Sequence, residues 1–163
     1  MNRKIVSWEE MRVLREQLAS RGKKVVFTNG CFDLLHVGHV RYLKEARQQG
    51  DLLIVGLNDD ESTRCIKGPG RPLMAQDDRA ETLAALEHVD YVVMFSERTA
   101  ERLVGTLRPD IYVKGGNYGM EELPEAKVVA SYGGKVYLTS VTPGRSTTNL
   151  ISAILAHYGK EGS

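Results

Sequence analysis

The stretch Thr28-Asn29-Gly30-Cys31-Phe32-Asp33-Leu34-Leu35-His36-Val37-Gly38-His39 decides how this chain is expected to fold. It is preceded by a β-branched apolar run at residues 25–28, typical of a buried strand, and followed by apolar residues at helical spacing around residues 42–46. A loop between a strand and a helix presents backbone N–H groups and the positive end of the helix dipole, which favours a phosphate. Gly30 and Gly38 let another group approach the backbone closely. The stretch therefore predicts a strand, an anion-binding loop and a helix.

His36 and His39 lie three residues apart, so a helix that begins here carries both imidazoles on one face. Two imidazoles at a helix amino terminus can donate hydrogen bonds to a phosphorus centre that gains negative charge in a transition state, and no nucleophilic serine or cysteine is needed. Two other interpretations stay open from these residues alone. The histidines can be a pair that only satisfies the helix start, or they can be zinc ligands together with Asp33 or Cys31.

Outward from this stretch, short apolar runs alternate with helical patterns. Runs typical of buried strands lie at residues 25–28, 52–55, 91–95, 111–113 and 136–138, and helical patterns lie at 7–22, around 42–50, around 80–86, at 103–107 and at 124–133. A last helix is expected from Ser146, with a buried stripe made of Leu150, Ile151, Ile154 and Leu155. The alternation predicts an α/β, Rossmann-like three-layer fold, in which helices cover both faces of a five-stranded parallel sheet. Ligands of such folds bind outside the carboxyl ends of the strands.

Bulk composition indicates one globular domain, residues 1–163, with an N-terminal helix (1–22) and a core at 24–158. The chain has 163 residues, 42% of them hydrophobic and 26% charged, and a formal net charge of +1. The net charge is therefore too small to attract nucleic acid or an anionic membrane electrostatically, and neither is expected as a partner. Cys31 and Cys65 are too few for a disulfide framework, and the sequence shows neither a signal-peptide core nor a membrane-spanning run. We expect a cytoplasmic protein.

Other side chains suit phosphates, although each also has an ordinary structural interpretation. Lys67, placed in a Gly- and Pro-bearing loop after the second strand, can reach triphosphate oxygens or be a solvated surface lysine. Ser146, Thr147 and Thr148 suit an N-cap and an anion site equally, because both use the start of a helix. Arg79, in the helical pattern after residues 76–78, can contact phosphate or form a structural ion pair.

The residues Gly30 to His39 resemble the GxFDxxHxGH signature of the cytidylyltransferase-like nucleotidyltransferases. Within that superfamily the chain is most similar to the bacterial D-glycero-β-D-manno-heptose 1-phosphate adenylyltransferases. Four ordered blocks, at residues 28–39, 67–72, 113–118 and 146–149, carry the resemblance from residue 7 to residue 149. The third block, Val-Lys-Gly-Gly-Asn-Tyr, is only a glycine turn when taken alone, but in the resembling families this position helps to hold the nucleotide.

The resemblance implies transfer of AMP from ATP to the phosphate of D-glycero-β-D-manno-heptose 1-phosphate, with Mg²⁺ on the ATP and no metal site on the protein. The catalytic residues that it implies are His36, His39 and Lys67. The nucleotide-binding residues that it implies are Asn29, Gly30, Cys31, Phe32, His36, Gly38, His39, Gly115, Asn117, Tyr118, Thr142, Ser146, Thr147 and Thr148, with Arg71 and Arg79 as further candidates for phosphate contacts. A homodimer is also expected, and because 163 residues leave no room for a kinase, the sugar kinase of the preceding step is expected on a separate chain.

The chain departs from the family patterns at two places. Glycerol-phosphate cytidylyltransferases carry an Arg-Thr-Glu-Gly-Ile-Ser-Thr-Thr-like block, and in the matching residues 141–148 Val141 stands in the place of its arginine, which weakens an interpretation with CTP as donor. Asn117 stands where the heptose enzymes usually have aspartate, and Arg145 has no counterpart in the pattern. Two alternatives stay open: another cytidylyltransferase-like enzyme, such as a glycerol-3-phosphate cytidylyltransferase or an FMN-type adenylyltransferase, and a nucleotide-binding regulator without catalysis.

Overall fold

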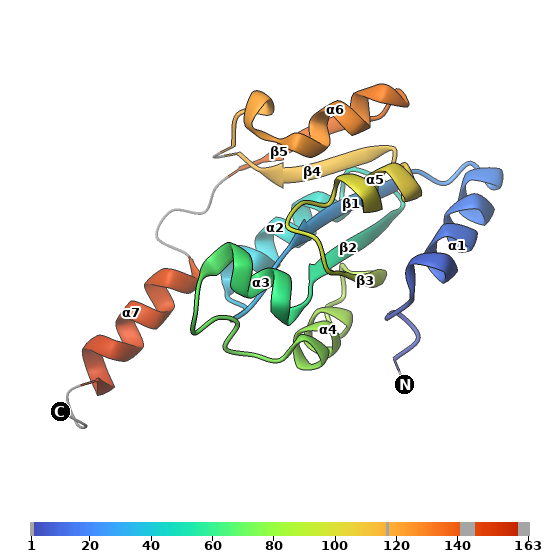
Figure 1. Ribbon diagram of the computed structural model, residues 1–163. Helices are drawn as coiled ribbons and strands as arrows, with labels where there is room; N and C mark the ends of the chain where they lie inside the picture. The colour runs from blue at the N-terminus through green and yellow to red at the C-terminus, as the bar shows by residue number, and fades with distance from the viewer. Residues whose placement is uncertain (1, 117, 141–145, 160–163) are drawn as a thin grey trace.

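The structure is a computed structural model that describes residues 2–116, 118–140 and 146–159. One parallel sheet holds five strands, in the order β3-β2-β1-β4-β5 (Figure 1). The strands are β1 (Val25–Gly30), β2 (Leu52–Asn58), β3 (Tyr91–Phe95), β4 (Ile111–Gly115) and β5 (Lys135–Thr139). The predicted five-stranded parallel sheet is confirmed, and each strand contains the run from which it was predicted.

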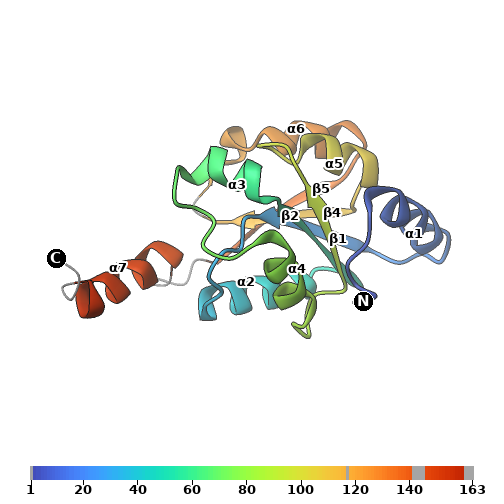
Figure 2. The same ribbon diagram turned by 60° about the horizontal axis from the view of Figure 1, so that its bottom comes forward.

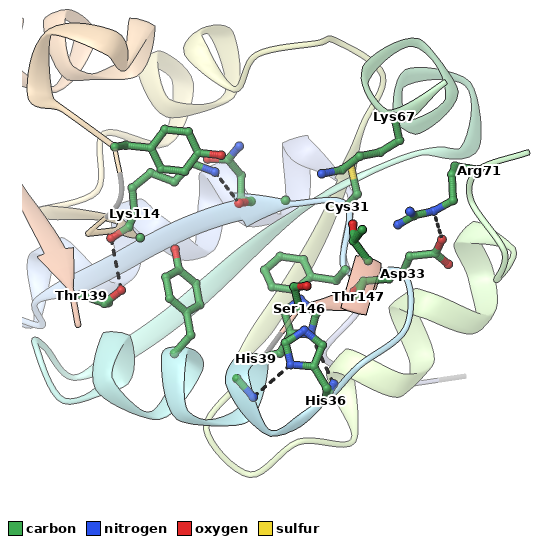
Figure 3. A pocket seen from close by; sticks show the side chains of 18 of the residues that line it. Cys31, Asp33, His36, His39, Lys67, Arg71, Lys114, Thr139, Ser146 and Thr147 are labelled. Atoms are coloured by element: carbon green, nitrogen blue, oxygen red, sulfur yellow. Dashed lines mark hydrogen bonds and ion pairs between the residues drawn. The ribbon is translucent and has the colours of Figure 1, made fainter. Parts of the chain in front are cut away.

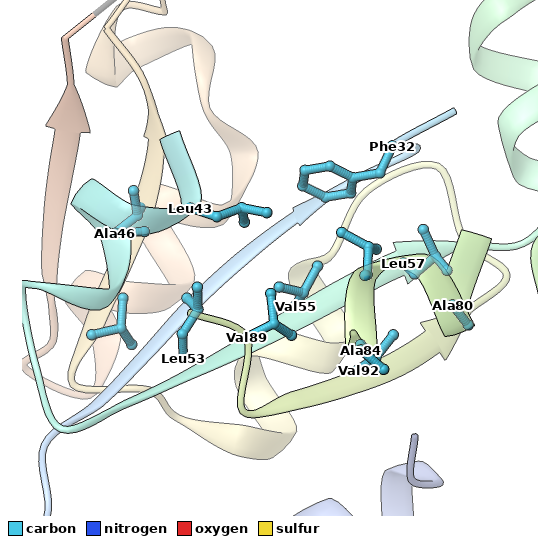
Figure 4. Close-up of a cluster of buried hydrophobic side chains, with 13 residues drawn as sticks. Phe32, Leu43, Ala46, Leu53, Val55, Leu57, Ala80, Ala84, Val89 and Val92 are labelled. Atoms are coloured by element: carbon cyan, nitrogen blue, oxygen red, sulfur yellow. The ribbon is translucent and has the colours of Figure 1, made fainter. Parts of the chain in front are cut away.

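Helices cover both faces of the sheet (Figure 2), which confirms the predicted three layers. On one face α2 (Val37–Arg47) and α4 (Gln76–Ala84) pack a core that includes Leu43, Leu83 and Val55 (Figure 4). On the other face lie α1 (Trp8–Ser20), α5 (Glu101–Leu107) and α6 (Pro124–Ser131). The side chains of each strand alternate between these two cores, because successive residues of a strand point to opposite faces of the sheet.

The pairing of β1 with its two neighbours is unequal, and this inequality positions the site. β1 pairs with β2 over six residues, from Val25 with Leu52 to Gly30 with Leu57. With β4, β1 pairs at only two positions, Val26 with Ile111 and Phe27 with Tyr112. The carboxyl ends of β1 and β4 therefore lie side by side without a backbone ladder. Since the strand order reverses between these two strands, this is the point of the sheet where α/β proteins bind ligands.

Two short elements were not predicted from the sequence. The helix α3 (Asp60–Lys67) follows β2, and a 3-10 turn, η1 (Met120–Glu122), follows β4. Asp59 caps α3 by accepting the N–H of Ser62 at 2.8 Å, and basic residues occupy its last turn. Lys67 is consequently the last residue of a helix, and its position is fixed more firmly than a loop would fix it. The loop position expected for Lys67 was wrong.

The last helix, α7 (Thr147–Tyr158), begins where it was predicted but is not buried. Ser146 is its N-cap and accepts the N–H of Asn149 at 3.0 Å. The expected buried stripe is wrong, because α7 projects away from the rest of the molecule in both views and none of its residues is buried (Figures 1 and 2). Leu155 is 62% exposed. Among the described residues, no helix is both long and apolar enough to cross a membrane.

Candidate active site

A cavity of about 400 Å³ opens at the carboxyl ends of β1, β4 and β5, at the gap between β1 and β4 (Figure 3). Its walls come from the β1–α2 loop, the start of α2, the end of α3, the end of β4 and the start of α7. The residues that line it are Asn29, Gly30, Cys31, Phe32, Asp33, His36, Gly38, His39, Tyr42, Lys67, Arg71, Lys114, Gly115, Tyr118, Thr139, Ser140, Ser146, Thr147 and Thr148. The structure thus gathers all four sequence blocks at one place.

His36 and His39 begin α2 and share one hydrogen-bonding pattern. The Nδ1 atom of His36 accepts the N–H of Gly38 at 3.0 Å, and the Nδ1 atom of His39 accepts the N–H of His36 at 3.3 Å. The two rings lie 4.0 Å apart between centroids. An imidazole nitrogen that accepts an N–H carries no proton, so each neutral ring holds its proton on Nε2. The two histidines therefore do accept backbone N–H groups at the start of α2, as one interpretation expected. The same hydrogen bonds favour, in each neutral ring, the tautomer with its N–H donor at Nε2.

The electrostatic surroundings keep His39 neutral. Burial, then the neighbouring His36, then Lys67 lower the pKa of His39 from 6.5 to about 4. The ring of Phe32 lies 5.5 Å from that of His39 and adds to its apolar contact. At neutral pH His39 is therefore an uncharged hydrogen-bond donor. This suits a group that stabilises charge that develops on a phosphate, because such a donor is already oriented before the reaction.

Asp33 holds the loop that carries Arg71. Its carboxylate accepts hydrogen bonds from Arg71 Nε at 2.8 Å and from the backbone N–H groups of Leu73 and Met74 at 2.8 and 2.9 Å. Burial raises the pKa of Asp33, but the two amides and Arg71 outweigh burial, and the net pKa lies below its ordinary value. Asp33 is thus ionised and fully engaged, and its ion-pair partner Arg71 stays at the pocket wall.

Zinc does not fit the residues present. Among the described residues, no group of three or more histidine, cysteine, aspartate or glutamate side chains is placed to hold a metal ion. Asp33 is committed to the Arg71 loop, and the Nδ1 atoms of both histidines are committed to the backbone of the helix start. The zinc interpretation of the His-x-x-His spacing is therefore not supported in the part of the chain that the structure describes.

Lys67 and Arg79, both candidates for phosphate contacts, take different places. Lys67 extends into the pocket from α3, on the side away from His36 and His39 (Figure 3). Arg79 is not among the lining residues. It is 1% exposed and donates to the carbonyl groups of Met74, Cys31 and Asn58 and to the carboxylate of Asp60, at 2.6–2.9 Å. The prediction of Arg79 as a phosphate ligand is wrong, because its guanidinium joins the loop after β1 to the end of β2, the start of α3 and the residues before α4.

The start of α7 completes the wall. Thr147 Oγ1 donates to the carbonyl oxygen of Leu34 at 3.0 Å, which fixes the helix start to the β1–α2 loop. Ser140, at the end of β5, is held by Glu45 of α2 through its N–H at 3.2 Å and its hydroxyl at 2.8 Å. Ser146, Thr147 and the N–H groups of this helix start thereby face the histidines. Of the remaining sequence candidates, Asn117 and Thr142, together with Arg145, lie outside the described residues.

Sequence reasoning missed several residues of the pocket, above all Lys114 and Tyr42. Tyr42 was assigned to the apolar face of its helix, but its hydroxyl reaches the end of β1 and bonds Thr28 Oγ1 and, at 3.1 Å, the carbonyl oxygen of Val113. Lys114 Nζ donates to the carbonyl oxygen of Asn29 at 2.9 Å. Both side chains satisfy strand carbonyls where β1 and β4 have no ladder. The signal for Lys114 was its place directly after a buried strand.

Curated relatives match nearly the whole chain. "Bifunctional protein HldE" of Syntrophotalea carbinolica is 57% identical over 150 residues, which make up 92% of this chain and 31% of the relative. The protein of the same name from Geobacter sulfurreducens is 57% identical over 142 residues, 87% of this chain and 29% of the relative. The chain thus spans about a third of the length of these relatives. Their name assigns two functions to one chain. In these relatives this contradicts the expectation that the second enzyme, a sugar kinase, lies on a separate chain.

Solved structures with the same arrangement include a protein described as the lipopolysaccharide core biosynthesis protein from Thermoplasma volcanium. It superposes with a TM-score of 0.61 at 27% identity, over 74% of this chain and 98% of that one. Pantoate-beta-alanine ligase from Francisella tularensis, crystallised with an ATP analogue, has a TM-score of 0.61 at 15% identity over 93% of this chain and 78% of its own, which is a likeness of fold. The model of the family described as cytidylyltransferase-like matches residues 27–152, a span that runs from within β1 to within α7 and contains all residues that line the pocket. The chain belongs to the cytidylyltransferase-like family.

Proposed function

We propose that this domain transfers AMP from ATP to the phosphate of D-glycero-β-D-manno-heptose 1-phosphate, giving ADP-heptose and pyrophosphate. The observation that supports nucleotidyl transfer is the pair His36 and His39. Their Nδ1 atoms accept backbone N–H groups, and both side chains line the same pocket as Lys67. The choice of substrates is supported by 57% identity to proteins named HldE and by the likeness to a lipopolysaccharide core biosynthesis protein.

The proposed reaction is a direct in-line displacement. An oxygen of the sugar phosphate attacks the α-phosphorus of ATP, a new P–O bond forms, and the bond from the α-phosphorus to the bridging oxygen of the β-phosphate breaks. The electron pair of that bond leaves with pyrophosphate. The attacking phosphate is already ionised at neutral pH, so no general base is required. Catalysis then depends on alignment of the two substrates and on stabilisation of negative charge.

Each element around the pocket has a role in this proposal. His36 and His39 donate hydrogen bonds to the phosphates around the α-phosphorus, and Lys67 offsets the developing charge from the opposite wall. The start of α7, at Ser146 to Thr148, binds the β- and γ-phosphates through its N–H groups and hydroxyls. Gly115 and Tyr118, at the end of β4, flank the nucleoside. Arg71 lines the wall beside Asp33 and contributes positive charge there.

Mg²⁺ enters this proposal as part of the substrate, MgATP. The described residues contain no carboxylate cluster suited to the ion, and Asp33 is occupied by Arg71 and two backbone amides. Octahedral Mg²⁺ is commonly held by substrate phosphates and water with few protein ligands, so ATP alone accounts for it. No step above depends on a metal held by the protein.

A substrate grid tests the proposal and separates its rivals. ATP or CTP is combined with heptose 1-phosphate or glycerol 3-phosphate, and pyrophosphate release is followed together with identification of the nucleotide product. Turnover only with ATP and the heptose phosphate supports the proposal. Turnover with CTP and glycerol 3-phosphate would identify the cytidylyltransferase alternative, and nucleotide binding without pyrophosphate from any pair would identify a regulator.

We also propose that the domain, with its core at residues 24–158, acts as a homodimer in the cytoplasm, where ATP is supplied. The exposed apolar side chains of α7, Leu150, Ile154, Leu155 and Tyr158, support contact with a second copy, since nothing among the described residues covers them. Light scattering after gel filtration tests this. Leu155→Glu should reduce the mass to that of a monomer, and Ala156→Glu, which puts the same charge on the exposed side of α7 opposite the stripe, should not. A monomeric wild-type protein would contradict the proposal.

A further inference from the structure

Lys114 is a half-buried basic side chain that spans the gap between β1 and β4 at the floor of the pocket. Its side chain leaves the end of β4, crosses toward β1 and donates from Nζ to the carbonyl oxygen of Asn29 at 2.9 Å (Figure 3). The ammonium also lies 5.8 Å from the centre of the Tyr118 ring. Asn29 lies at the end of β1 and Tyr118 in the loop after β4, on opposite sides of the switch point, so Lys114 joins the two halves of the site.

No carboxylate among the described residues forms an ion pair with Lys114. Glu125 of α6 favours the charged form of the lysine from beyond ion-pair distance, and its carboxylate accepts the N–H of Ala100 at 2.9 Å at the start of α5. An ammonium carries three N–H donors. The hydrogen bond to Asn29 uses one of them, which leaves two donors for a ligand in the pocket.

Three basic groups converge on the pocket. Burial is the main cause that lowers the pKa of Lys114; Glu125 and Cys31 raise it, and Lys67 lowers it further. Lys67 likewise lowers the pKa of His39. Lys67 of α3 and Lys114 of β4 thus line the same pocket as two basic groups that disfavour each other's charge, beside the neutral donor His39 of α2. An anion placed between the two lysines relieves their repulsion, and Asp33, the buried carboxylate of the pocket, is already engaged by Arg71.

We propose that Lys114 is a nucleotide-binding residue whose ammonium contacts the phosphate groups of the bound nucleoside triphosphate at the floor of the pocket. The inference rests on the proposed function only in taking a nucleoside triphosphate as the ligand. Through its bond to Asn29 the same side chain couples phosphate binding to the position of the loop that carries His36 and His39.

Binding of ATP in the absence of any acceptor tests the proposal. Isothermal titration calorimetry compares the wild type with Lys114→Met, Lys114→Arg and, as a matched control, Lys127→Met, which removes an exposed lysine of α6. Loss of a hydrogen bond to a charged group costs about 1.5–3 kcal/mol, so Lys114→Met should weaken ATP binding about 10- to 100-fold. Lys127→Met should bind like the wild type. Equal ATP affinity of folded Lys114→Met and wild type would overturn the proposal.

The pH dependence of ATP affinity distinguishes the charge of Lys114 from its packing and stays decisive if Lys114→Met does not fold. Because burial lowers the pKa of Lys114, the wild-type lysine loses its proton below the ordinary lysine value of 10.5, and ATP affinity should fall as the pH rises through the lowered pKa. Lys114→Arg stays charged, so its affinity should fall less steeply. Identical alkaline profiles for the two proteins would contradict a contact between Lys114 and phosphate.

Inorganic tripolyphosphate separates failure of this inference from failure of the proposed function. If Lys114 contacts phosphate, tripolyphosphate binding weakens in Lys114→Met by a factor similar to that for ATP. That result stands even if heptose 1-phosphate proves not to be the acceptor. Conversely, wild-type turnover with ATP and heptose 1-phosphate, together with unchanged tripolyphosphate binding in the variant, would remove Lys114 from the phosphate site and leave the proposed reaction intact.

Discussion

The Nδ1 atom of His39 accepts the backbone N–H of His36 at 3.3 Å, and this bond at the first turn of α2 decides which nitrogen of His39 can serve the pocket. His39→Ala removes the Nε2 donor and should lower kcat about 10²- to 10³-fold, the usual cost of losing one donor to developing negative charge. Steady-state pyrophosphate release measures this. His39→Gln places an amide N–H near the Nε2 position and should retain more activity than His39→Asn. Full turnover by His39→Ala would remove His39 from the reaction.

Acid should destabilise the protein partly through His39. Its pKa is about 4 in the folded protein against 6.5 for the free side chain, so the unfolded chain binds more protons between these values. The contribution of His39 to stability is therefore complete above pH 6.5 and is lost as the pH falls toward about 4. Chemical denaturation across this range should show the free energy of unfolding falling less steeply with acid in His39→Gln than in the wild type. Equal slopes would contradict a neutral, buried His39.

Asp33 should matter more for stability than an exposed acidic residue in an ion pair. Asp33→Asn turns an N–H₂ group toward donors and leaves Arg71 unpaired, which should cost about 3–5 kcal/mol of unfolding free energy. Because the pKa of Asp33 is lowered in the fold, its contribution is present above the ordinary carboxyl value and disappears as the pH falls through the lowered one. Glu97→Gln, which breaks the exposed pair with Arg102, should cost less than about 1 kcal/mol. Similar losses of unfolding free energy in both variants would contradict a stabilising role for the hydrogen bonds that Arg71, Leu73 and Met74 donate to Asp33.

Arg79 should behave as a structural residue. Arg79→Lys cannot reach three carbonyl groups and one carboxylate at once, so the thermal midpoint should fall markedly, as expected when a buried charged network is broken. At temperatures where the variant stays folded, its ATP affinity should remain close to that of the wild type. Arg102→Lys, at an exposed arginine, serves as the control for stability. A stable Arg79→Lys protein with weak ATP binding would restore Arg79 to the phosphate site.

The sheet and the histidine loop could be predicted because their signals are local. Each strand is a short apolar run bounded by polar or glycine residues, and the run from Thr28 to His39 places loop glycines and two imidazoles in a fixed order. Helix α3 was missed since Ser62 and Thr63 are its buried residues and no apolar stripe marks it; its signals are the cap at Asp59 and charges at both ends.

Other features depend on tertiary structure. The apolar period of α7 correctly indicated a helix, but a period does not say which element covers the stripe, and in this structure Leu155 is exposed. The place of Lys114 follows from the short β1–β4 ladder, which ends at Phe27 and Tyr112. Arg79 matched a family position, yet only the fold shows that Cys31 and Asn58 turn their carbonyl groups toward it.

The most direct test of the central claim is formation of ADP-heptose by the purified wild-type protein from ATP and D-glycero-β-D-manno-heptose 1-phosphate, with pyrophosphate quantified in the same reaction. The proposed function predicts equal amounts of ADP-heptose and pyrophosphate, and loss of both in His39→Ala. Absence of ADP-heptose from a folded protein that binds ATP, or equal amounts from wild type and His39→Ala, would contradict it.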